Sequence, residues 1–111
     1  MFQNLLLLYP ARRQRRIDAI ARHVAEQCID DVASLVAGRV KAMSLCEARG
    51  YIRARAAAEL RRKTRLVLRQ VPEADDAWET EIVSRAGDRL APLALRRCAA
   101  QSRASATLRA A

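Results

Sequence analysis

Glycine, proline and aromatic residues are scarce in this chain. Its 111 residues include three glycines and three prolines, and aromatic residues make up only 4%. Many short strands would need many turn residues, so these low numbers argue against a turn-rich β fold. Alanine, arginine and leucine dominate instead, and all three are strong helix formers. The composition therefore predicts an all-α protein.

Cysteine is also rare. The three cysteines, Cys28, Cys46 and Cys98, are odd in number and form no C-x-x-C pair. We therefore expect neither a disulfide framework nor a zinc site, and we predict a cytoplasmic protein. Cys28 and Cys46 read as small buried hydrophobic residues. Cys46 near a helix start, and Cys98 beside Arg96 and Arg97, each have part of the setting that activates a thiol.

Catalytic motifs are missing as well. The chain has no P-loop, no G-x-G-x-x-G, no H-E-x-x-H and no nucleophile elbow. His23, the single histidine, shares a helix face with Glu26, Gln27 and Asp30, which is typical of a solvated side chain. We therefore predict a protein that is not an enzyme and needs no cofactor or metal. An enzyme that uses His23 or a cysteine is the third-ranked alternative.

Hydrophobic periodicity predicts two long helices. The first covers residues 11–43, with one apolar face that includes Ile17, Val24, Cys28, Leu35 and Val36. The segment 44–47 reads Ser-Leu-Cys-Glu, which matches a capping box. A second helix is therefore predicted over 45–70, and Pro72 ends it.

Two shorter helices are expected in the last third of the chain. One covers 73–86, with an acidic first turn and Gly87 as its C-cap. Pro92 begins a short helix over about 92–101. We predict one small helical bundle in residues 1–101 and a disordered tail in 102–111. Because large side chains are few, a homo-oligomer held through Trp78 and Leu60 would complete the core.

Positive charge is concentrated on the second predicted helix. The net charge is +9, and residues 51–71 hold seven basic residues against one acid. One face of this helix carries five arginines, namely Arg55, Arg61, Arg62, Arg65 and Arg69. Such a face suits the phosphates of DNA or RNA. Since cations near a helix C-terminus are favoured by the helix dipole, a solvated face without a ligand is the alternative.

A second basic cluster lies near the N-terminus, at Arg12, Arg13, Arg15 and Arg16. Cations at the start of a helix oppose its dipole, so helix stability does not explain them. They suit an anionic surface, a partner's carboxylates, or an extended basic arm. The apolar run Leu5–Leu8 beside them keeps an anionic membrane surface as a further alternative, although it is far shorter than the roughly 18 residues of a membrane span.

Three functional hypotheses follow from the sequence. We favour a non-enzymatic protein that binds a polyanion, nucleic acid, through the arginines of 55–69. The alternative is a helical interaction or assembly module, whose basic face meets an acidic protein or the acidic patch of its own chain. That patch is Asp75, Asp76, Glu79 and Glu81. The pairing within one chain or across a dimer would neutralise the nucleic-acid surface.

Overall fold

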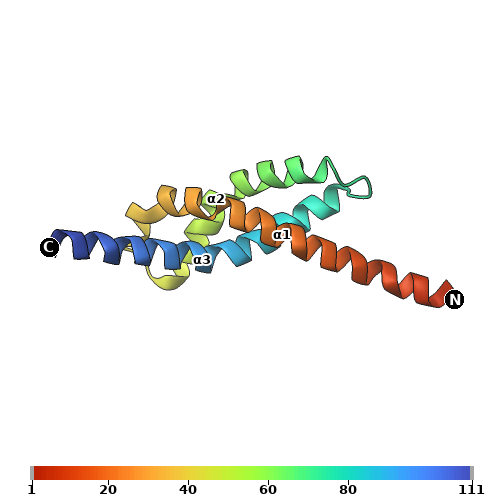
Figure 1. Ribbon diagram of the computed structural model, residues 1–111, viewed down its shortest axis with the longest axis horizontal. Helices are drawn as coiled ribbons and strands as arrows, with labels where there is room; N and C mark the ends of the chain where they lie inside the picture. The colour runs from red at the N-terminus through yellow and green to blue at the C-terminus, as the bar shows by residue number, and fades with distance from the viewer. Residues whose placement is uncertain (1, 111) are drawn as a thin grey trace.

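The protein is a bundle of three helices. The computed structural model describes the backbone of residues 2–110 and the side chains of residues 9–108. Its helices are α1 (Phe2–Val40), α2 (Leu45–Leu68) and α3 (Asp76–Ala110), and the described residues contain no strand. α2 runs opposite to α1 and α3, and the two outer helices extend past the bundle at opposite ends (Figure 1). The all-α prediction is confirmed.

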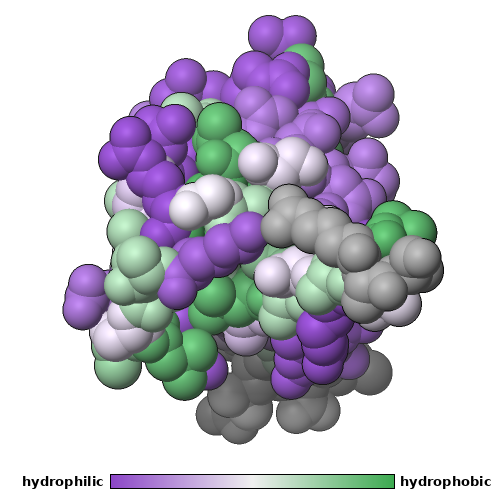
Figure 2. Space-filling model, turned by 90° about the vertical axis from the view of Figure 1, so that its left-hand side faces the viewer, coloured by the Kyte–Doolittle hydropathy of each residue, from purple (hydrophilic) through white to green (hydrophobic). Residues whose placement is uncertain are grey.

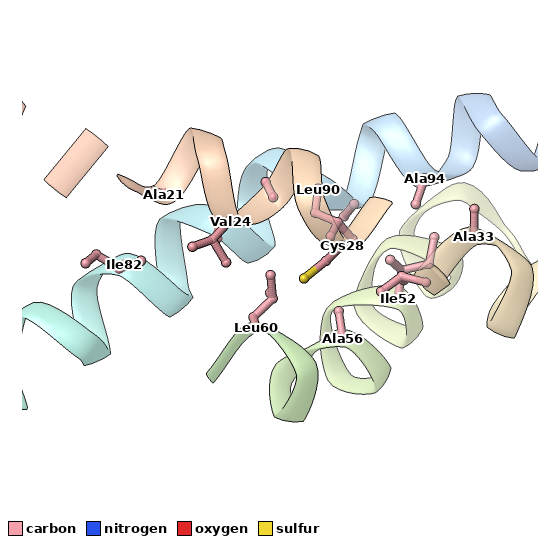
Figure 3. Packing of buried hydrophobic residues seen from close by; sticks show 14 of the residues in the cluster. Ala21, Val24, Cys28, Ala33, Ile52, Ala56, Leu60, Ile82, Leu90 and Ala94 are labelled. Carbon is pink, nitrogen blue, oxygen red and sulfur yellow. The ribbon is translucent and has the colours of Figure 1, made fainter. Parts of the chain in front are cut away.

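The core lies where one stripe of each helix meets the other two. In α2 the buried residues recur at every fourth position, as Ala48, Ile52, Ala56, Leu60 and Thr64. Figure 3 shows Val24 and Cys28 of α1 facing Leu60 of α2 and Leu90 of α3. Because much of this core is alanine, the backbones can approach closely. Because each helix buries one apolar stripe, its opposite face remains exposed to solvent.

The start of α2 follows its sequence signature. The Ser44 Oγ accepts a hydrogen bond from the Glu47 backbone N–H at 3.3 Å, and the Ser44 hydroxyl donates to the Glu47 carboxylate at 3.1 Å. The first bond satisfies a backbone N–H that the first turn leaves without a partner, and the second holds the two side chains together. The predicted start of this helix at residue 45 is confirmed.

The helix count predicted from the sequence is wrong. α3 begins at Asp76 instead of residue 73, with the Asp75 carboxylate accepting from the Trp78 N–H at 3.2 Å. It then passes through Gly87 and Pro92 without ending, so Gly87 is no C-cap. An interior proline costs about 3 kcal/mol in a helix. Buried Leu90, Ala91 and Ala94 pack on both sides of Pro92, and this burial outweighs the cost.

The bounds of α1 and α3 also differ from the predicted ones. α1 begins before residue 11, continues through Pro10, and ends at Val40 instead of residue 43. α3 includes residues 102–110, which the sequence assigns to a tail, and the side chains of 101–108 are all exposed. The predicted apolar face of the first helix is buried except for Leu35, which is 55% exposed. The side chains of Leu5–Leu8 lie outside the described residues.

Candidate nucleic-acid interface

The arginines of α2 point away from the core. The four-residue spacing of its buried stripe leaves the opposite face to solvent, and all five predicted binding residues lie there. Each of Arg55, Arg61, Arg62, Arg65 and Arg69 is exposed. Figure 2 shows hydrophilic side chains gathered along the upper side of the molecule, where the second half of α2 lies in Figure 1. The stripe in the core thus positions the arginines outside it.

Four of these arginines surround one open depression. Arg61, Arg62, Arg65 and Arg69 line a hollow of about 420 Å³, together with Ala58 and the partly exposed Leu66. We call this surface the arginine groove. Arg61, Arg65 and Arg69 succeed one another at about one turn, and Arg62 lies beside Arg61, so the guanidinium groups follow the helix axis. Arg55 stands nearer the start of α2 and does not line the groove.

Two arginines of the groove contact carboxylates of the same chain. Arg62 contacts Glu59 at 2.6 Å, and Arg65 contacts Glu79 of α3. The hydrogen bond from Arg62 lowers the pKa of the Glu59 carboxyl below its ordinary value. Within the described residues, Arg55, Arg61 and Arg69 have no ion pair. The face therefore keeps a clear positive excess.

The acidic patch neutralises little of this surface. Only Glu79 reaches an arginine of the groove, while Glu81 contacts Arg13 and Arg85. Asp75 accepts from a backbone N–H at the start of α3. The proposed pairing of the patch with the basic face within one chain is thus limited to one contact among the described residues.

The N-terminal arginines divide into two pairs. The guanidinium of Arg13 lies 5.6 Å from the ring centre of Trp78 and contacts Glu81 at 3.3 Å. Arg16 contacts Glu73 at 2.7 Å, so both of these side chains tie α1 to the region around the start of α3. The other two, Arg12 and Arg15, are exposed.

The expected conflict between these arginines and the helix dipole is removed by the length of α1. Since α1 begins at Phe2, residues 12–16 lie beyond its first two turns, and the dipole acts mainly on the first. This segment is helical, so an extended arm is not what the structure shows. Half of the cluster pairs with carboxylates of the same chain at its surface.

Two of the three cysteines are buried, and the histidine is exposed. Burial raises the pKa of the Cys28 and Cys98 thiols, and the Cys98 thiol donates to the Ala33 carbonyl at 3.5 Å. An activated Cys98 is thus contradicted, and Cys46 is exposed instead of buried. His23 lies on the exposed side of α1. Among the described residues, no cluster of three or more His, Cys, Asp or Glu side chains is placed to hold a metal.

Two crevices flank α2, and neither has a local signature in the sequence. One lies between α1 and α2 and is lined by His23, Gln27, Lys63 and Gln70 with apolar neighbours. The other lies between α2 and α3 and includes Glu79. Their lining residues come from distant parts of the chain, and a helical wheel of one segment cannot bring them together. The position of Lys63 beside α1 therefore could not be predicted from the sequence.

Comparison with known proteins adds no family to these observations. No protein-family model, no curated protein and no solved structure matches the chain. No helix in the described part of the chain is both long enough and apolar enough to cross a membrane. What the arrangement offers chemically is a row of guanidinium groups that can donate to anionic oxygens.

Proposed function

We propose that the protein binds nucleic acid without catalysing a reaction, and that the arginine groove holds phosphates. The observation that carries the proposal is the convergence of Arg61, Arg62, Arg65 and Arg69 on one open hollow. Guanidinium forks match phosphate oxygens in geometry and keep their charge at any physiological pH. The net charge of +9 would draw a polyanion toward this face.

The length of the basic face fits a short stretch of nucleic acid. Arg55 and Arg69 are fourteen residues apart on one helix, which places them about 21 Å from each other along its axis. This distance equals about six nucleotide steps of 3.4 Å. Arg55, Arg61 and Arg69 are not held by carboxylates of the described residues, so phosphate contacts need not break existing ion pairs there.

The test is a salt titration of binding to a fluorescently labelled oligonucleotide. Four phosphate contacts predict that the logarithm of the binding constant falls with the logarithm of salt concentration, with a slope of about −3. Arg61→Glu with Arg69→Glu should weaken binding by about 100-fold at low salt. Arg89→Glu with Arg96→Glu is the matched control, because it changes the net charge equally at exposed positions of α3. Equal losses in the two variants, or binding without salt dependence, would refute the proposal.

A second candidate function is assembly into a homo-oligomer. Its support is the bare end of α3, where the side chains of 101–108 are exposed and Leu108 is 79% exposed. Trp78 and Leu60 are buried within one chain, so they stabilise the monomer and do not report on an interface. We expect a dimer by light scattering that Leu108→Glu dissociates. A monomer at every concentration would exclude this function.

The cellular setting that we propose is the reducing cytoplasm. All three cysteines are free thiols, and two of them are buried in the core. Structural disulfides are common in oxidising compartments and rare in reducing ones. Localisation of a tagged chain would test this assignment, and secretion would contradict it.

A further inference from the structure

The arginine groove shares lining residues with a crevice on each side of α2. Leu66 lines both the groove and the crevice between α1 and α2, which has a volume of about 390 Å³. Arg61 and Arg65 line both the groove and the crevice between α2 and α3, of about 320 Å³. A strand that leaves the groove sideways therefore meets one of these two crevices.

The two crevices differ in charge. The crevice between α2 and α3 contains the carboxylate of Glu79, which contacts Arg65, and the hydroxyls of Thr80 and Ser84. No carboxylate lines the crevice between α1 and α2, where Lys63 supplies a positive charge. Because like charges repel, phosphates in the groove are better continued toward the α1 side. We call this second site the Lys63 crevice.

The walls of the Lys63 crevice combine apolar and amide surfaces. Val24, Leu66 and Val67 provide apolar contact, and the polar residues include the amides of Gln27 and Gln70. An amide side chain has both a donor and an acceptor, and it can pair with a base edge by two hydrogen bonds. The imidazole of His23 adds a flat ring on which a base can stack. The volume of the Lys63 crevice is in the range of small-molecule sites.

We infer that the Lys63 crevice takes an unstacked base of a single-stranded nucleic acid whose phosphates lie in the arginine groove. This inference rests on the proposed function and adds the form of nucleic acid to it. A duplex keeps its bases stacked and paired, so it cannot place one in a crevice without paying for extrusion. A flexible single strand can offer the flat apolar body and the polar edge of a base together.

The test compares three labelled probes of equal length at one salt concentration. These are a single-stranded adenine oligonucleotide, a strand with the same phosphates but abasic sugars, and a duplex. Stacking and edge contacts of one base are worth about 1–3 kcal/mol, so the strand with bases should bind roughly 5- to 150-fold more tightly than the abasic strand. The duplex should also bind more weakly than the single strand.

A double amide variant tests whether the base lies in the Lys63 crevice. Gln27→Ala with Gln70→Ala should reduce the affinity for the adenine strand toward that of the abasic strand and leave abasic binding unchanged. Both residues are exposed, so the fold should survive, and circular dichroism melting checks this. Gln101→Ala, at an exposed position of α3, is the control and should change neither affinity.

The outcomes separate this inference from the function on which it rests. Equal binding of the adenine and abasic strands, or an adenine preference that survives the Gln27 and Gln70 changes, would overturn the inference. If Arg61→Glu with Arg69→Glu still abolishes salt-dependent binding in that case, the groove function stands. If no probe binds in a salt-dependent manner, the proposed function fails as well.

Discussion

Arginine clusters twice on this bundle, and the two clusters meet different neighbours. Near the N-terminus, Arg13 covers Trp78 and contacts Glu81, and Arg16 contacts Glu73. On α2, four arginines share one open groove, and only two of them have a carboxylate partner among the described residues. The first cluster ties α1 to α3 and to the loop before it, while the second stays largely free of carboxylates among the described residues.

The difference arises from what each helix faces. α1 lies beside α3 in parallel, so its arginines meet the acidic first turns of α3 and the preceding loop. α2 turns its apolar stripe inward, and the arginines of its basic face have solvent opposite them, apart from Arg65 at the border with α3. Arg53, outside this face, contacts Asp88 of α3. Two arginine clusters of similar sequence thus differ in their contacts, because α3 and the loop before it pack against the first of them.

The largest effect that separates the clusters is on stability. Arg13→Glu with Arg16→Glu removes two ion pairs and a cation–π contact and sets like charges against Glu81 and Glu73. We expect the free energy of unfolding to fall by about 2 kcal/mol. Arg61→Glu with Arg69→Glu should change it by less than about 0.5 kcal/mol. Urea unfolding measures both, and equal losses would remove the distinction.

A smaller effect concerns single pairs. The Arg13 side chain is 21% exposed and Arg62 is 58% exposed, so water screens the second pair more strongly. Double-mutant cycles should give a coupling of about 1 kcal/mol for Arg13 with Glu81 and a smaller coupling for Arg62 with Glu59. A larger coupling for the α2 pair would show that the exposed cluster also stabilises the fold.

The fold class, the start of α2 and the outward face of its arginines follow from local rules. The four-residue spacing from Ile52 to Leu60 places the basic face opposite, and Ser44 with Glu47 sets the helix start. Local rules did not predict the uninterrupted α3, because a proline such as Pro92 normally ends a helix. The burial of its neighbours keeps the helix intact there. Tertiary contacts outweigh local signals there.

Only part of the candidate site was predicted from the sequence, and tertiary packing is again the reason. A helical wheel groups Arg61, Arg62, Arg65 and Arg69, which line one groove, but it also includes Arg55, which does not. It says nothing of Glu79, because that carboxylate comes from α3. The Lys63 crevice needs the packing of α1 on α2 and has no local signature.

A further test releases one arginine of the groove. Glu79→Gln keeps the shape of the side chain and removes the carboxylate that contacts Arg65. We expect affinity for a labelled oligonucleotide to rise about threefold, since one more guanidinium is available to phosphate. Asp88→Asn makes the same charge change beside Arg53, outside the groove, and should raise affinity less. Equal gains would mean that net charge, and not the groove, sets binding.

The smallest effect is a pH dependence in the α2 cluster. Because Arg62 lowers the pKa of the Glu59 carboxyl, this pair stabilises the fold above pH 4.5, the ordinary value, and that contribution is lost as the pH falls through the lowered pKa. Glu59→Gln should abolish this part of the acid dependence, and the effect should be small because water screens an exposed helical pair. Urea midpoints at pH 7 and pH 3 measure it in both proteins. The N-terminal pairs are unchanged in the variant, so the remaining acid sensitivity belongs to them and to the other carboxylates. An unaltered pH profile would assign Glu59 no part in stability and leave Arg62 available to phosphate.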